Sequence, residues 1–97
     1  MSTYIALANY TDQGMRHVRE SPARLDQAKA RLHAMGGEFR AFYMTFGQYD
    51  LVFVYEAPDD AIAARFILEL GVLGNIRTTT LKAFPEAAYR ELIAHLR

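Results

Sequence analysis

The stretch Phe39–Pro58, FRAFYMTFGQYDLVFVYEAP, decides the fold. Two runs rich in aromatic and β-branched residues, 39–46 and 51–55, flank the tetrapeptide GQYD at 47–50. Aromatic and β-branched residues favour strands, whereas glycine and aspartate favour turns, so the stretch predicts a β-hairpin. We expect the rest of the chain to pack against this hairpin or to extend its sheet.

Length and composition set the broad class. The chain has 97 residues, of which 52% are hydrophobic, so we expect a single domain spanning residues 1–97 with a real core. Eleven Lys and Arg balance eleven Asp and Glu, which argues against nucleic acid and membrane surfaces as partners. The lack of cysteine excludes disulfides and thiolate metal sites. No apolar run approaches the roughly 20 residues that span a bilayer, so the expected protein is soluble and cytoplasmic.

The N-terminal half predicts a strand followed by helix. Residues 3–10 (TYIALANY) form the strand, and Thr11 or Asp12 is placed to cap a short helical turn. Ser21-Pro22 predicts the start of a longer helix, with the serine accepting from the first free amides. Gly36-Gly37 should end this helix. Its core-facing stripe comprises Leu25, Ala28, Leu32 and Met35.

The C-terminal half predicts a helix, a strand and a last helix. Asp59 is the expected cap of the first of these helices, which can end at Gly71 or Gly74. Its stripe comprises Ile62, Ala63, Phe66, Ile67, Leu70 and Leu73. The Thr-rich segment 77–84 is typical of an edge strand. Pro85-Glu86 begins the last helix, whose apolar side comprises Ala88, Leu92, Ile93 and Leu96.

The resulting order is β-α-β-β-α-β with a C-terminal helix appended. Two split βαβ units in this order specify a ferredoxin-like α+β sandwich, in which both main helices lie on one face of a four-stranded antiparallel sheet. The expected strand order is 4-1-3-2.

The strands are more apolar than one sheltered face requires. The run Leu51–Tyr55 is apolar throughout, and 39–46 places bulky side chains on both sides. Two helices can cover only one face of a sheet, and the C-terminal segment is short. We therefore predict a homodimer in which two sheets pack face to face, burying on the order of 800 Å² per partner. The alternative is a monomer whose C-terminal helix folds across the sheet.

The segments TFGQYDLVFVYEAPDD, LGNIRTTTLKAF, TYIALANYTDQG and RESPARLDQAKA resemble the GYD-domain family over nearly the whole chain, with Gly47, Tyr49 and Asp50 matching the name-giving motif. The resemblance implies a dimeric α/β-barrel fold and no established activity. Residues 47–84 are also similar to the effector-binding domain of the feast/famine (leucine-responsive) regulators. The chain lacks the helix-turn-helix that precedes that domain in a full regulator, so the similarity implies small-molecule sensing without direct DNA binding.

The turn is the first candidate site. Gly47 and Asp50 suit a turn as such, since glycine accepts unusual backbone angles and aspartate bonds its own turn. In the functional interpretation Asp50 binds a ligand amine or acts as a base, which burial would favour by raising its pKa. Arg77, beside Thr78–Thr80, either binds a carboxylate or is part of a solvated edge strand. The proposed ligand-binding set is Tyr43, Gly47, Tyr49, Asp50 and Arg77, and no catalytic residue is assigned.

Aromatic residues offer a second possibility, either core packing or the lining of a small-molecule cleft beside the partner subunit. They are Tyr4, Tyr10, Phe42, Tyr43, Phe46, Phe53 and Tyr55. The three histidines, at 17, 33 and 95, lack metal-site spacing and are expected at the surface. His17 with Arg16 and Arg19 forms either an anion site or a solvated basic face. No metal or cofactor is expected.

Three functions stay open at this stage. The first is a homodimeric binding or sensing module with a small-molecule ligand. The second is a cofactor-independent oxygenase or isomerase, which rests on the fold alone. The third is a purely structural domain for oligomerisation.

Overall fold

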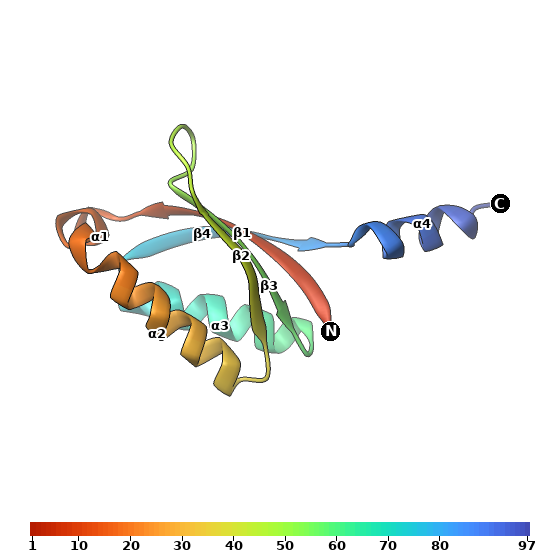
Figure 1. Cartoon of the computed structure of the whole chain (residues 1–97), viewed down its shortest axis with the longest axis horizontal. Helices are drawn as coiled ribbons and strands as arrows, with labels where there is room; N and C mark the ends of the chain where they lie inside the picture. Colours follow the sequence, from red (N-terminus) through yellow and green to blue (C-terminus); the bar gives the residue numbers. More distant parts are fainter.

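The computed structural model describes residues 1–97 (Figure 1). In chain order the elements are β1 (Ser2–Tyr10), α1 (Asp12–Arg16), the 3₁₀ turn η1 (Val18–Glu20), α2 (Ser21–Ala34), β2 (Glu38–Met44), β3 (Leu51–Ala57), α3 (Asp60–Leu73), β4 (Ile76–Ala83) and α4 (Glu86–Ala94). The predicted βαββαβ order with an added C-terminal helix is confirmed. None of the helices combines the length and the apolar character needed to cross a bilayer.

The four strands form one antiparallel sheet in the order β2-β3-β1-β4, which is the predicted 4-1-3-2 arrangement. Both α2 and α3 lie on the same side of this sheet (Figure 1). The ferredoxin-like α+β class is therefore confirmed. The two edge strands are β2 and β4, and β3 and β1 lie between them.

Side-chain caps begin two of the helices as predicted. Thr11 accepts a hydrogen bond from the Gly14 amide (3.1 Å) at α1, and Asp59 accepts one from the Ile62 amide (2.9 Å) at α3. The prediction for Ser21 is wrong. No side chain caps α2, because the Ser21 hydroxyl is 3.1 Å from the Tyr10 hydroxyl and bonds to it instead.

The core lies between the helices and one face of the sheet. Every second residue of β1 and β3 points into it, as the two-residue period of a strand requires. Tyr55 and Phe66 are fully buried and pack edge to face, with ring centroids 5.3 Å apart. The buried apolar residues are Tyr4, Ala6, Ala8, Leu32, Leu51, Phe53, Tyr55, Ala57, Ala63, Phe66 and Leu70.

Strand β2 is irregular. Its pairing with β3 shifts between Phe39 and Ala41, so Arg40 is an extra residue in the ladder. Because of this bulge Phe39 and Phe42 both pack against the core, whereas Ala41 and Tyr43 pair with residues of the opposite face. The strand ends at Met44, two residues earlier than predicted.

The second face of the sheet is also apolar, as predicted. We call it the open face, and its apolar residues are Ile5, Leu7, Ala41, Tyr43, Val52, Val54 and Leu81. No helix of the chain lies over it, because α4 extends away from the body of the protein (Figure 1). The alternative in which the C-terminal helix covers this face is therefore not the arrangement that the structure has.

Candidate functional site

The loop between β2 and β3 is bound tightly to the end of β1. The Asp50 carboxylate accepts a hydrogen bond from the Tyr10 amide (2.9 Å), and the Asp50 amide donates to the Ala8 carbonyl (2.9 Å). The Asn9 side chain accepts from the same Asp50 amide (3.1 Å). Asp50 thus joins the hairpin to the central strand, which supports the structural interpretation of this residue.

The loop itself needs its glycine. Gly47 has φ of +137°, a conformation that side chains rarely allow, and an added Cβ would meet nothing within 4 Å. The Thr45 hydroxyl donates to the Tyr49 carbonyl (2.6 Å) and so closes the loop from within. The loop projects beyond the sheet (Figure 1), and Phe46 is 92% exposed there.

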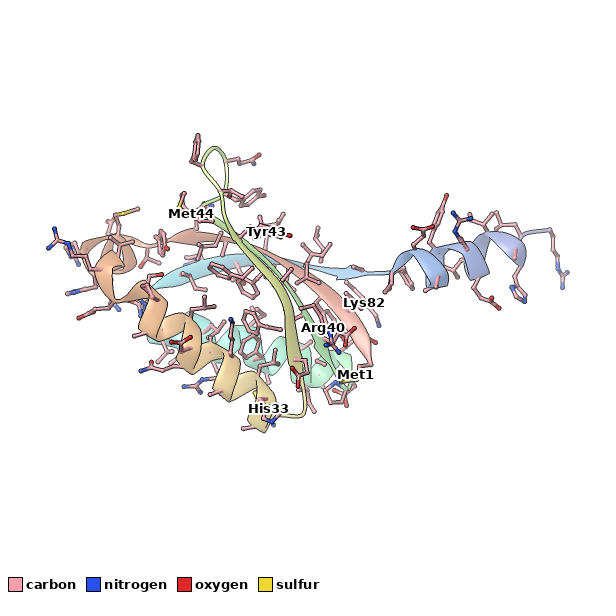
Figure 2. All side chains as sticks on the ribbon, in the orientation of Figure 1. Met1, His33, Arg40, Tyr43, Met44 and Lys82 are labelled. Carbon is pink, nitrogen blue, oxygen red and sulfur yellow. The ribbon has the colours of Figure 1, made fainter.

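The five residues predicted to bind a ligand do not share one pocket. Tyr43 is exposed on edge strand β2 (Figure 2), and Arg77 is exposed on the opposite edge strand β4. Three strand spacings of about 4.8 Å separate the two edges, or about 14 Å. Gly47, Tyr49 and Asp50 lie in the loop. Within one chain these side chains leave no common cavity, and their ligand role stays a prediction.

A polar cluster that the sequence did not reveal joins β1, α3 and β4. The Tyr4 hydroxyl donates to the Asp60 carboxylate, and Lys82 Nζ lies 2.8 Å from Asp60 Oδ1. The hydrogen bonds from Lys82 and then Tyr4 lower the pKa of Asp60. The pKa of Tyr4 is raised, chiefly by burial and then by its bond to Asp60. A tyrosine with a raised pKa stays protonated near pH 7 and can donate its hydrogen bond to Asp60. The cluster therefore links α3 to strands β1 and β4.

This cluster was not visible in the sequence because its members are far apart in the chain. Tyr4 and Asp60 are 56 residues apart, and Asp60 and Lys82 are 22 apart. Only the pairing of Tyr4 with Lys82 in adjacent strands brings them together. An open hollow beside the cluster also contains Thr80, whose buried hydroxyl has no hydrogen-bond partner.

A deeper cavity lies between α2 and the sheet, with a volume of about 90 Å³. Three of the predicted aromatic residues, Tyr10, Phe42 and Phe53, line it. The sequence predicted a cleft between the sheet and a partner subunit, whereas this cavity lies within a single chain. These rings face the helices of their own chain because the strand period and the β2 bulge direct them there.

The histidines are all at the surface, as expected. Their side chains are 57% (His17), 78% (His33) and 74% (His95) exposed, and each lies within 4 Å of a neighbouring glutamate. Arg16 and Arg19 are exposed beside His17, which fits a solvated basic face. No group of three or more acidic or histidine side chains is arranged to hold a metal ion.

Helix α4 presents an apolar stripe to solvent. Tyr89, Leu92 and Ile93 share one face of the helix, Leu96 follows just after the helix end, and each of the four is at least 50% exposed. No residue of α4 is buried. Its side chains stand clear of the rest of the protein in Figure 2. Of the predicted stripe, Leu92 and Ile93 lie exposed on the helix, whereas Ala88 is half-buried and Leu96 follows the helix end. Tyr89 was not predicted to belong to it, and nothing in the chain covers these exposed residues.

The structure defines a small α+β domain of the ferredoxin-like class with two apolar surfaces that its own chain leaves uncovered. The profile of the GYD domain matches residues 4–93, and the chain belongs to this family. The chain is 38% identical over 98 residues to the "Glutamine synthetase and cystathionine beta-lyase binding protein" of Thermus thermophilus, with both chains covered completely.

Two solved structures share the fold. One is described as "crystal structure of FFRP-DM1" (TM-score 0.59, 27% identity), with 87% of this chain and 100% of that chain covered. The other is hypothetical protein PHS023 from Pyrococcus horikoshii (TM-score 0.57, 26% identity), with 89% and 93% covered. Both support the ferredoxin-like assignment.

Proposed function

We propose that this protein is a homodimeric binding module that pairs through its open face and attaches to an enzyme through α4. The main support for this proposal is the large area of the chain that is exposed to solvent. The chain exposes 6717 Å² for a mass of 11.0 kDa. A monomeric globular protein of this mass exposes about 5,600 Å². The excess of about 1,100 Å² is similar to what one subunit buries in a stable interface.

The open face suits a second copy of the chain. Its centre, formed by Ile5, Val52 and Val54, carries no charge, and the Arg40–Glu56 ion pair (2.7 Å) lies on edge strand β2 and neighbouring β3. An apolar centre with a polar rim is the usual anatomy of a protein interface. Pairing two such faces would remove from water the apolar side chains that α2 and α3 leave uncovered.

The α4 stripe suits a different partner. Its exposed apolar residues at i, i+3 and i+4 on one face are typical of an amphipathic helix that enters an apolar groove. The Thermus relative matches this chain along its full length and is named as a binding protein for two enzymes. By this relationship the proposed partner is a glutamine synthetase or a cystathionine β-lyase.

The dimer is tested by placing a charge on the open face. Val54→Lys should convert a dimer of twice 11.0 kDa into a folded 11.0 kDa monomer, measured by light scattering at micromolar concentration. The matched control is Val72→Lys on α3, where the valine is already 85% exposed. A wild-type protein that is monomeric under these conditions would refute the proposal.

Enzyme binding is tested with purified glutamine synthetase and cystathionine β-lyase from the source of this chain. Leu92→Glu should abolish binding to the immobilised enzyme while the dimer persists. Ala87→Glu on the opposite side of α4 is the control and should bind like wild type. If Leu92→Glu instead dissociates the dimer, α4 belongs to the subunit interface and the assignment of its stripe to an enzyme is wrong.

A further inference from the structure

The cavity beneath α2 has an unusual combination of linings. Most of its wall is apolar, including Leu25, Ala28, Phe42, Phe53, Leu70 and Ile76. Ser21 and Arg24 are three residues apart on α2, and the Tyr10 hydroxyl lies 3.1 Å from that of Ser21. The other polar residues of the lining are Gln27, Arg31 and Asn75. Gln27 and Leu73 line the cavity and are exposed, so it is open to solvent.

Arg24 has a guanidinium nitrogen without a partner. Its Nη1 atom donates to the His17 carbonyl (2.9 Å) and lies 3.8 Å from the Glu20 carboxylate, which is itself 70% exposed. Its Nη2 atom is buried and makes no hydrogen bond. Burying N–H donors of a cation without an acceptor is costly, so such groups are normally paired. Arg24 is also one of the residues that line the cavity, so the unpaired donor belongs to a side chain of the cavity wall, and a small turn of the guanidinium would present it to a ligand.

The neighbouring hydroxyls can supply one more donor. The Tyr10 and Ser21 hydroxyls lie 3.1 Å apart and share one hydrogen bond. Each hydroxyl has one proton, so the pair has one left to donate to a third group. Arg24 and this pair together form a small set of donors without an acceptor.

The charge of the lining selects the ligand. Two arginines, Arg24 and Arg31, line the cavity and no Asp or Glu does. Arg31 is paired closely with Glu69 (2.7 Å), whereas Arg24 lies 3.8 Å from Glu20 and keeps one nitrogen unpaired, so Arg24 is the group available to an anion. A planar carboxylate matches the guanidinium fork. An ammonium group would find no carboxylate in the lining, which disfavours a free amino acid.

The size of the cavity selects a short chain. A cavity of about 150 Å³ accommodates benzene, so the present one suits a smaller molecule. Its volume of about 90 Å³ leaves room for a carboxylate with a few carbon atoms, and its rings and aliphatic side chains favour an apolar tail.

We propose that the cavity between α2 and the sheet binds a short apolar monocarboxylate, with the carboxylate on Arg24 and the Tyr10–Ser21 hydroxyl pair and the tail against Phe42 and Phe53. This site lies on the helix-covered side of the sheet, away from the open face. Its occupancy is therefore independent of the proposed dimer and of the enzyme contact.

Three related probes test the charge selection by titration calorimetry and by amide chemical shifts. They are propanoate, its uncharged amide propanamide, and alanine, which adds an ammonium group to the same skeleton. The acid should bind at least about tenfold more tightly than the amide or alanine, because only the acid pairs with Arg24 without bringing an unpaired group. Equal binding of acid and amide, or no binding of the acid, would overturn the proposal.

Two variants test the location. Arg24→Met keeps an unbranched apolar stem but removes the guanidinium donors, and it should weaken binding of the acid at least about tenfold. Arg16→Met, which removes an exposed arginine of α1, is the matched control and should bind like wild type. An unchanged affinity in Arg24→Met would place the ligand elsewhere and refute the assignment.

Folding is checked on the same samples. Ala28→Leu should fill the cavity, weaken binding of the acid and retain the wild-type circular dichroism spectrum. Should Arg24→Met unfold, Ser21→Ala gives a second measurement and is expected to weaken binding severalfold. Undiminished binding in a folded Ala28→Leu variant would overturn the site. Val54→Lys should bind the acid like wild type, which separates this inference from the dimer proposal.

Discussion

At the scale of single residues, Asp50 connects the hairpin to β1 through both its backbone and its carboxylate. The carboxylate oxygen that accepts from the Tyr10 amide is part-buried, and that amide lies at the very end of β1. Glycine and tyrosine beside it have local roles, since Gly47 turns the chain and the Tyr49 carbonyl closes the loop. The motif therefore has a structural function whatever it binds.

Removing the Asp50 carboxylate should destabilise the protein. Asp50→Ala leaves the Tyr10 amide without its acceptor and should lower the free energy of unfolding by about 1.5–3 kcal/mol. Asp50→Asn keeps an acceptor oxygen and should lower it less. Urea denaturation measures the difference, with Asp26→Ala on the exposed side of α2 as the control. Equal stability of Asp50→Ala and wild type would show that the link contributes nothing.

Two buried phenols should make the fold sensitive to alkali. Burial raises the pKa of Tyr4, and burial raises the pKa of Tyr55 further, from the ordinary value of 10.0. In the unfolded chain these groups ionise near pH 10, so the unfolded state loses protons first and stability falls as pH rises above about 10. Below that value the contribution is fully present.

The alkaline effect is checked with Tyr55→Phe. The variant loses one weak hydrogen bond to the Ala63 carbonyl (3.2 Å) and should be less stable than wild type at neutral pH by about 1 kcal/mol. It should also lose less stability between about pH 9 and 11, because one titrating phenol is gone. Denaturation midpoints across this range measure both effects. Parallel curves for the two proteins would contradict the assignment.

At the scale of elements, local signals decided most of the fold. Thr11 and Asp59 cap helices as predicted, Gly74 ends α3 with φ of +84°, and the apolar stripe of α2 packs on the core. Each of these rests on residues a few positions apart, so the sequence alone specifies them. Helix α2 starts at Ser21 as predicted, but Ser21 does not cap it, because its hydroxyl has a distant partner in the Tyr10 hydroxyl.

The candidate site was less predictable, since it depends on contacts between distant segments. Arg40 forms a bulge that sets which way Phe42 and Tyr43 face, and a shift of one residue reverses every side chain of a strand. The buried, unpaired Nη2 atom of Arg24 arises only from the packing of α2 in the folded chain. No spacing along the chain reports such contacts.

Replacing glycine by alanine should have opposite effects on stability at two positions, Gly14 and Gly71. A Cβ at Gly14 would lie 1.9 Å from the Asn75 carbonyl oxygen, where the turn after α3 meets α1, so Gly14→Ala should destabilise the protein by about 1–3 kcal/mol or more. A Cβ at Gly71 would meet nothing within 4 Å, and the position is helical. Gly71→Ala should therefore stabilise by about 0.4–1 kcal/mol.

The pair is measured by thermal unfolding of both variants beside wild type. Because the substitution is identical, helix propensity acts in the same direction at both positions, and only the close approach of Asn75 distinguishes them. A Gly14→Ala variant as stable as Gly71→Ala would show that α1 does not contact the turn after α3.

At the scale of the whole molecule, the chain is less compact than a typical globular chain of the same length. Its radius of gyration is 14.6 Å, whereas a compact chain of 97 residues has about 12.5 Å. Only 13 of 97 residues are buried, so the core within one subunit is small. A chain with so little internal burial is expected to gain stability from association.

That expectation predicts unfolding that depends on protein concentration. When a dimer unfolds to two free chains, tenfold dilution lowers its stability by about 1.4 kcal/mol, which corresponds to a decrease in Tm of about 3–6 °C. Calorimetry at three concentrations measures the shift. Val54→Lys, which charges the open face, should melt at a lower temperature that no longer varies with dilution, whereas Val72→Lys should follow wild type. A wild-type Tm that is constant across a hundredfold range would mean that the open face is stable in water, and the excess surface would then need another explanation.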